Sequence, residues 1–207
     1  MYSSKYFEVN DSEIIFDFIK NYSFGTLISS TKDFPIATHL PLDIHKEQED
    51  TYLLGHFAYA NPHWKLLKEN PQVLITFLGP HAYVSSSWYT HENVPTWNYL
   101  SVHIYGTTHF VEGKELEIML EKMLEKYEQH RDNAVLWDTL DSEFLKREIQ
   151  GIVGFKVKIE RIEASFKLSQ NRNNDDYKSI ISNLKNEKDS SSIEVASWMK
   201  KIRQINE

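Results

Sequence analysis

The stretch 97–111, WNYLSVHIYGTTHFV, alternates between two kinds of side chain along its whole length. One set of alternate positions is aromatic and polar, with Tyr99, Ser101, His103, Tyr105 and Thr107, and the other holds Leu100, Val102, Ile104 and Gly106. A period of two residues is that of a β-strand whose faces meet different surroundings. The stretch therefore predicts a long strand, apolar on one side and aromatic and polar on the other.

Shorter segments on both sides of this strand have the same apolar, β-branched and aromatic composition. They cover 24–30, 36–42, 52–58 and 73–78 before the long strand and 152–162 after it. Charged residues and Asn-Pro pairs separate them, and the charged run 45–50 is expected to be one of the connections. Short connections favour antiparallel pairing, so these segments predict a mainly antiparallel sheet.

Apolar residues at helical spacing predict helices around this sheet. The clearest stripe is Leu116, Met119, Leu120, Met123, Leu124 and Tyr127, with the Met residues expected as core filler. Further helices are expected at 11–21, capped by Asn10 and Glu13, and at 141–149, 175–186 and 191–205, the last with Ile205 in its stripe. Asn61 and Pro62 predict another turn or two of helix at 63–68. Together the elements predict an α+β fold, a β-barrel with peripheral helices.

Composition and length are those of one ordinary globular domain. The chain has 207 residues, of which 41% are hydrophobic and 26% are charged. Because it contains no Cys, disulfides, thiolate nucleophiles and Cys-bound metals are excluded. Residues 1–172 are expected to form the barrel domain and residues 173–207 a helical extension packed on it. Without an apolar run of membrane-spanning length or a signal peptide, the chain is expected to be cytoplasmic.

The charge balance argues against nucleic acid as a partner. Thirty acidic residues against 23 basic ones leave a formal net charge of −7, and such a field repels DNA. The only basic cluster is Lys200-Lys201-x-Arg203, and no helix-turn-helix pattern is found. Direct DNA binding is therefore not supported by charge.

Common catalytic motifs are missing from this sequence. His91-Glu92 lacks the second His of a zinc-protease motif, and Ser85-Ser86-Ser87 lacks the glycines of a hydrolase elbow. No segment has the glycine spacing of a phosphate-binding loop. We expect neither a metal site nor an obvious catalytic base, with His81 and Tyr83 the residues most worth mutating.

Several short segments instead join hydroxyl or amide groups to a rigid aromatic residue or a proline. They are 38–41, 55–58 with 61–62, 79–85, 87–89, 94–99 and 167–172. Such combinations suit a flat ligand with polar edges and a phosphate. The alternative is that Trp88 and Trp97 are core or interface anchors and that Pro80 and Pro95 only form turns.

In that order, these segments resemble the PaiB family of FMN-binding transcriptional regulators. The most specific parts are 79–97 and the string Lys167-Leu168-Ser169-Gln170-Asn171-Arg172. The resemblance covers the chain almost end to end. It implies a split β-barrel like that of the pyridoxamine-phosphate oxidases, and a homodimer with FMN in the cleft between two barrels. It also implies negative regulation of protease production and sporulation.

Carried over by segment, the resemblance implies a flavin ring beside two segments with backbone N–H groups, Thr38-His39-Leu40-Pro41 and Trp97-Asn98. The phosphate is expected at Arg172, Lys167 and the hydroxyls of Ser85, Ser86 and Ser87, because a dianion needs charge-assisted donors. The other members of the expected site are Trp88, Gln170 and Asn171.

Some of these residues have a simpler alternative. Arg172 could form a surface ion pair, and Asn61 could be only a helix cap before Pro62. Tyr59 stands where some relatives are expected to carry a basic residue, which weakens the case for phosphate binding at that turn.

Three function classes stay open at this point. The chain could be a regulator, an FMN-dependent oxidoreductase in which the cofactor carries the redox chemistry, or a module that binds flavin or haem without direct DNA contact. A homodimer is also expected from the aromatic strand faces, which the few helices of one chain cannot cover.

Overall fold

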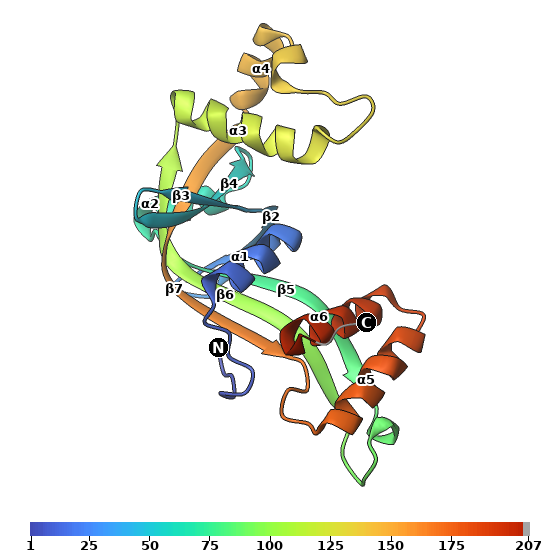
Figure 1. The fold of residues 1–207 in the computed structure, drawn as a ribbon. Helices are drawn as coiled ribbons and strands as arrows, with labels where there is room; N and C mark the ends of the chain where they lie inside the picture. The colour runs from blue at the N-terminus through green and yellow to red at the C-terminus, as the bar shows by residue number, and fades with distance from the viewer. Residues whose placement is uncertain (205–207) are drawn as a thin grey trace. The chain divides into compact units, whose positions relative to one another are not determined.

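The computed structural model describes residues 1–204, and its strands form one seven-stranded sheet in the order β2-β1-β5-β6-β7-β4-β3 (Figure 1). The strands are β1 (Phe24–Ser29), β2 (Ile36–Pro41), β3 (Asp43–Glu47), β4 (Asp50–Ala58), β5 (Gln72–Val84), β6 (Thr96–Val111) and β7 (Ile152–Lys167). β1 pairs antiparallel with β2 and β5, and β4 pairs antiparallel with β3 and β7. The long strand predicted at 97–111 is confirmed as β6.

The helices are α1 (Ser12–Asn21), α2 (His63–Glu69), α3 (Gly113–Glu128), α4 (Ser142–Ile149), α5 (Asn174–Asn186) and α6 (Ser190–Arg203). Short 3-10 turns occur at η1 (Ser86–Trp88) and η2 (Trp137–Thr139). All the predicted helices are present, and the α+β class is confirmed. The last part of the helix predicted to reach 205, with Ile205, lies outside the described residues. In residues 1–204 no helix is both long and apolar enough to cross a membrane.

Two local predictions are wrong. The run 45–50 is not simply a connection, because its first residues belong to the edge strand β3 (Asp43–Glu47). This strand pairs antiparallel with β4, with Glu47 opposite Asp50. Charged side chains suit an edge strand, since they discourage pairing with another chain. The cap of α1 is Asp11 rather than Asn10, and its carboxylate accepts the N–H groups of Glu13 at 2.9 Å and Ile14 at 3.3 Å.

Contacts along the chain divide it into two compact units. Unit 1 contains residues 1–22, 77–103 and 163 onward, and unit 2 contains 23–76 and 104–162. The long strands β5, β6 and β7 each contribute to both units. The expected domain boundary at residue 172 stays a prediction.

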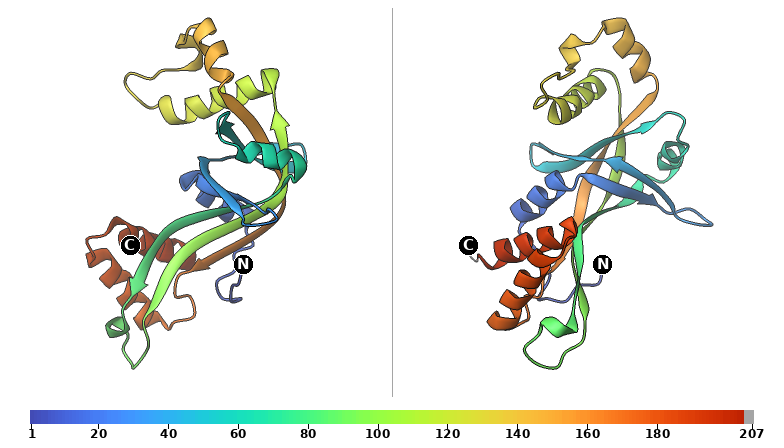
Figure 2. Two further views of the ribbon diagram at one scale, coloured as in Figure 1. Left: turned by 180° about the vertical axis from the view of Figure 1, so that it is seen from behind. Right: turned by 90° about the vertical axis from the view of Figure 1, so that its right-hand side faces the viewer.

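Unit 1 has an aromatic core beneath its helices. Phe166 on β7 lies 5.2 Å from Phe18 of α1 and 5.6 Å from Trp198 of α6, measured between ring centroids. A Cβ at Gly79 would lie 2.5 Å from the Phe18 ring, so only glycine lets α1 pack this closely on β5. Figure 2 shows α5 and α6 side by side next to β5. The Ser191 hydroxyl of α6 hydrogen-bonds the backbone of His81 on β5.

Unit 2 has a core of strand side chains. Residues on alternate positions are fully buried, among them Leu27, Leu53, Ile75, Ile104, Phe155 and Val157. A Cβ at Gly106 would lie 2.1 Å from the carbonyl oxygen of Lys158, so β6 and β7 approach one another too closely for any other residue. Val111 and three residues on the buried face of α3, Leu116, Met119 and Leu120, form a further buried cluster, which confirms Met119 as core filler.

Candidate functional site

Two cations lie close together in unit 1, at the end of β7 and in the loop that follows it. The ammonium group of Lys167 donates a hydrogen bond to the Thr96 hydroxyl. Burial, and secondly the positive charge of Arg172, lower the pKa of Lys167. In residues 1–204 no carboxylate pairs with Lys167 or Arg172. The alternative of a surface ion pair for Arg172 is therefore wrong within that range.

The guanidinium of Arg172 has an aromatic support. It lies 4.9 Å from the ring centroid of Tyr89, a residue that is 9% exposed. A cation over an aromatic face is attracted by the ring quadrupole while its N–H donors remain available to an anion. Two cations without a counter-charge make an electrostatically unsatisfied site, which an anion would relieve.

Side-chain hydrogen bonds of Ser169 and Gln170 fix the loop that connects these cations. Ser169 has a left-handed backbone with φ of 61°, and its hydroxyl donates to Asn98 Oδ1 at 3.0 Å. Gln170 bonds the Leu168 N–H at 2.8 Å and the Phe166 carbonyl at 2.5 Å. Asn98 and Gln170 thus support the loop, and a direct contact of either with a ligand stays a prediction.

Arg203, near the end of α6, holds the same loop from another side. Its Nη2 donates to the backbone carbonyls of Gln170 at 2.8 Å and Arg172 at 2.7 Å. Nη1 donates to Asn174 Oδ1 at 3.2 Å, and the guanidinium stacks 3.7 Å from the Tyr177 ring centroid. The sequence placed Arg203 in a basic cluster and missed this role, because the partners are about thirty residues away.

Asp176, on the first turn of α5, organises the segment around Tyr89. Its buried carboxylate accepts the Thr90 N–H at 2.8 Å, the Thr90 hydroxyl at 2.9 Å and Asn173 Nδ2 at 2.7 Å, and lies 3.3 Å from His91 Nδ1. The backbone bond from Thr90 is the first cause that lowers the pKa of Asp176. Sequence analysis missed Asp176, although an Asp three residues after the cap Asn173 was a visible signal.

The expected serine cluster forms the turn η1 in unit 1. The hydroxyls of Ser85 and Ser87 lie 2.8 Å apart, and Ser85 also accepts the Ser87 N–H at 3.2 Å. Ser86 is exposed, and Trp88 is half-buried with its carbonyl bonded by the Ser179 hydroxyl at 2.7 Å. The turn is therefore fastened to α5.

Trp97 belongs to an exposed aromatic group in unit 1. It is 53% exposed, so it is not a core residue. Its ring centroid lies 5.9 Å from that of Tyr83, edge-on, and 6.2 Å from that of His81. The backbone N–H and carbonyl of His81 are both bonded by the Ser191 hydroxyl at 2.9 Å. β5 and β6 therefore carry an exposed group of aromatic rings here.

The expected segment 38–41 lies on β2 in unit 2. Thr38 hydrogen-bonds the buried His63 at Nδ1 over 2.8 Å, and Ser29 bonds the other ring nitrogen over 2.7 Å. Burial lowers the pKa of His63. Asn61 accepts the His63 N–H at 3.0 Å, but the N-cap of α2 is Pro62 rather than the predicted Asn61.

The remaining members of that segment differ in exposure. His39 is exposed and bonds Thr26 over 2.9 Å, whereas Leu40 is buried and Pro41 is half-buried. The expected site is therefore divided between the units. Unit 2 holds 38–41, and unit 1 holds 85–88, 97–98 and the residues Lys167, Gln170, Asn171 and Arg172.

Comparisons with known proteins agree with this fold. Residues 1–161 match the family model described as "Putative FMN-binding domain". The chain is 51% identical to the "Protease synthase and sporulation protein PAI 2" of Bacillus subtilis over 199 residues, which is 96% of each chain.

Two solved structures have a similar fold at low identity. The FAD and Heme binding protein from Mycobacterium smegmatis has a TM-score of 0.61 and 13% identity, covering 77% of this chain and 73% of its own. The Flavocytochrome Anf3 from Azotobacter vinelandii has a TM-score of 0.59 and 15% identity, covering 86% and 78% respectively. The split-barrel prediction is confirmed, and this chain belongs to the PaiB-type family of FMN-binding domains.

Proposed function

We propose that this chain binds FMN and takes part in the negative control of protease production and sporulation. The observation that carries the flavin part is the pair Lys167 and Arg172, two cations with no carboxylate partner in the described residues. Lys167 bonds Thr96, the residue before the exposed Trp97. Lys167 at the end of β7 is therefore bonded to the start of β6, next to the exposed Trp97.

The residues present fit a flavin phosphate. Arg172 offers a planar set of donors for a dianion, and Lys167 adds a second charge. Ser85, Ser86 and Ser87 are proposed as neutral donors to the same group. Trp97 and Asn98 of unit 1 are proposed beside the ring. Thr38 to Pro41, which lie in unit 2, stay a prediction from the family resemblance.

When bound, FMN would supply redox chemistry that no side chain of this protein supplies. The contribution of the protein is to hold the phosphate, cover the ring and limit access of water. An FMN-dependent oxidoreductase therefore stays an alternative, for which we assign no catalytic residue.

A homodimer is proposed from exposed apolar side chains. In unit 2, Phe24 is 68% exposed, and in unit 1 Leu78 is 62% exposed. Large apolar groups on strand faces are typical of surfaces that a second protein covers. A second copy of the chain is the proposed partner.

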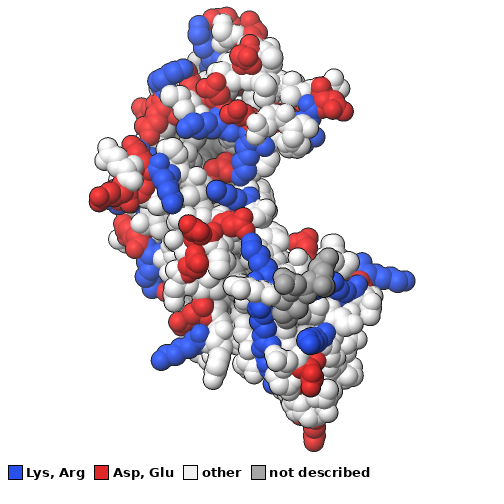
Figure 3. All heavy atoms as spheres, in the orientation of Figure 1, with Lys and Arg blue, Asp and Glu red and all other residues white. Residues whose placement is uncertain are grey.

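The regulatory part follows from the name of the Bacillus relative and its high identity over nearly the whole chain. Direct DNA binding is not part of the proposal, because the predicted basic cluster is engaged within the chain. Lys201 pairs with Asp17 at 2.7 Å, Arg203 holds the loop at 170–172, and Lys200 also has a partner. On the face drawn in Figure 3, basic and acidic side chains are intermingled. A flavin-binding module that regulates indirectly, in the cytoplasm, is the form of regulator we propose.

Titration of the ligand-free protein with FMN, followed by flavin absorbance and fluorescence, tests this function. We expect saturable binding with one FMN per chain and weaker binding of riboflavin, which lacks the phosphate. Equal affinity for the two ligands would contradict a phosphate site, and no binding of either would contradict the flavin proposal.

A further inference from the structure

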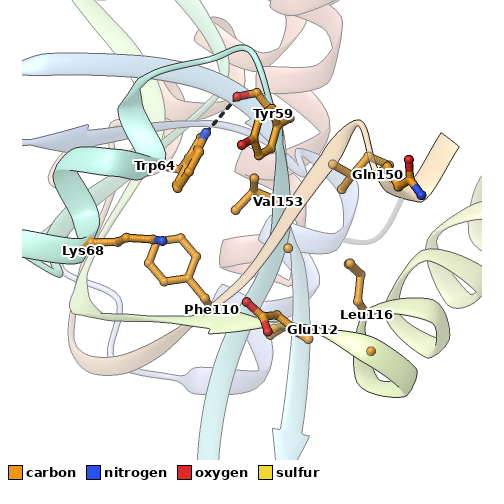
Figure 4. A pocket seen from close by; sticks show the side chains of 12 residues that line it. Tyr59, Trp64, Lys68, Phe110, Glu112, Leu116, Gln150 and Val153 are labelled. Carbon is orange, nitrogen blue, oxygen red and sulfur yellow. Dashed lines mark hydrogen bonds between the residues drawn. The ribbon is translucent and has the colours of Figure 1, made fainter. Parts of the chain in front are cut away.

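A cavity of about 410 Å³ lies within unit 2, among α2, α3 and the adjoining ends of β6 and β7 (Figure 4). Its aromatic wall is made by Tyr59, Trp64 and Phe110, and Leu116 and Val153 add aliphatic surface. None of the residues proposed for the flavin lines it. The volume is within the range of small-molecule sites, roughly 300 to 1,000 Å³.

The aromatic wall of this cavity is already in place. The Trp64 indole N–H donates to the Tyr59 carbonyl at 2.9 Å, and the two rings lie 5.5 Å apart between centroids. Trp64 itself is only 8% exposed. Because the indole N–H is satisfied within the protein, the ring offers a ligand a fixed apolar surface and no free donor.

Two opposite charges line the cavity, and neither is neutralised by the protein. Lys68 Nζ lies 4.9 Å from the Trp64 ring centroid and 6.0 Å from that of Phe110, and within residues 1–204 it has no carboxylate partner. Glu112 is the N-cap residue of α3, but its side chain makes no capping hydrogen bond, and it too lacks an ion pair within this range. In Figure 4 both side chains lie next to Phe110.

Unpaired charges beside apolar walls favour a ligand that neutralises both of them. A group with one charge would satisfy Lys68 or Glu112 and leave the other beside a bound apolar body, where loss of water is costly. A zwitterion satisfies both. The amide of Gln150, which also lines the cavity, can bond either end of it.

We propose that this cavity binds a free α-amino acid with a large apolar or aromatic side chain. The carboxylate pairs with Lys68, the ammonium group with Glu112, and the side chain lies against Phe110, Leu116 and Val153. This would be a second small-molecule site, separate from the proposed flavin site, and it would give a regulator a way to respond to amino-acid supply.

Isothermal titration calorimetry with three probes tests the proposal. L-phenylalanine carries both charges, 3-phenylpropionate carries only the carboxylate, and 2-phenylethylamine carries only the ammonium group. We expect L-phenylalanine to bind roughly tenfold or more tightly than either analogue, because each lost charge-assisted contact weakens binding by about that factor or more.

Substitutions then assign each contact. Lys68→Gln should weaken L-phenylalanine binding roughly ten- to a hundred-fold and leave 2-phenylethylamine unchanged, while Glu112→Gln should weaken L-phenylalanine and leave 3-phenylpropionate unchanged. The unchanged analogue shows that the variant is folded. Lys65→Gln is the matched control, since Lys65 also lies 5.6 Å from the Trp64 ring but does not line the cavity.

Val153→Phe fills the cavity without changing any charge and should abolish binding of all three probes. L-phenylalanine binding that survives this substitution, or that falls equally in Lys65→Gln and Lys68→Gln, would overturn the proposal. Equal affinity for the three probes would also overturn it. So would the absence of L-phenylalanine binding up to roughly 10 mM, a concentration about tenfold above a Kd of 1 mM. Arg172→Ala should leave L-phenylalanine binding unchanged, and this result would show that the cavity is separate from the proposed flavin site.

Discussion

Arg203 donates a hydrogen bond of 2.7 Å to the backbone carbonyl oxygen of Arg172. The loop that carries the Arg172 side chain is thus held by Arg203. Since Arg203 lies on α6 and Arg172 follows β7, the final helix of the chain fixes the geometry of the proposed phosphate site. Arg203, which the sequence placed in the only basic cluster, instead bonds the loop that is proposed to hold the phosphate.

Replacing Arg172 by Ala should weaken FMN binding by roughly ten- to a hundred-fold, since a charge-assisted hydrogen bond contributes about 1.5 to 3 kcal/mol. Riboflavin affinity should stay unchanged, because riboflavin has no phosphate. Paired titrations with the two ligands check this. If the variant binds FMN as well as the wild type does, the phosphate lies elsewhere, and Lys167 or the serines at 85–87 are next to be tested.

Arg203→Ala should lower the free energy of unfolding by about 1 to 3 kcal/mol, because the half-buried carbonyls of Gln170 and Arg172 lose their charged donor. Urea unfolding measures this change. Lys188→Ala on the exposed surface is the matched control and should stay within about 0.5 kcal/mol of the wild type. A stability loss no greater than that of the control would show that Arg203 does not hold the loop.

Sequence-specific DNA binding is not expected. The net charge of −7 repels a duplex, and any contact should be weak and steeply dependent on salt. Footprinting on candidate promoters at low and moderate salt measures this. Protection that survives moderate salt and disappears when Lys200, Lys201 and Arg203 are replaced by Ala would restore direct DNA binding.

Stability should fall as the pH is lowered below about 6.5, the ordinary pKa of histidine. Burial lowers the pKa of His63 in the folded state, so the unfolded chain binds a proton at a higher pH than the folded one does. The stabilisation is present above the unfolded pKa and is lost as the pH falls through the folded pKa. Urea unfolding at several pH values between about 7.5 and about 5 measures the slope, which is the change of the free energy of unfolding with pH.

His63→Gln should reduce that slope, while His130→Gln at an exposed position should leave it unchanged. His56 and His103, whose pKa values are also lowered chiefly by burial, account for the slope that remains. An identical pH profile in His63→Gln and the wild type would contradict the assignment.

Sedimentation at low micromolar concentration should show a dimer, with an interface of more than about 2,000 Å² if it is obligate. Phe24→Glu should shift the equilibrium toward monomer, because a carboxylate would be buried in the contact. A wild-type chain that sediments as a stable monomer would rule out the dimer.

Much of the fold follows from local patterns in the sequence. The period of two in 97–111 and the apolar stripe from Leu116 to Tyr127 are enough to place β6 and α3, because burying one face of an element requires that spacing. The edge strand β3 escaped the same reasoning. An edge strand buries little of its surface, so Asp43 to Glu47 has no clear apolar period.

The family resemblance carried by the string that ends at Arg172 predicts an anion site there, since Lys and Arg near hydroxyl and amide groups suit a phosphate. What holds that site was decided only by tertiary structure. Asp176 bonds Thr90 across 86 positions, and Arg203 bonds Arg172 across 31. The cavity beside Trp64 likewise joins residues from separate elements. Local periodicity reports which face of an element is buried, whereas hydrogen bonds and cavities between distant segments exist only once the backbone brings them together.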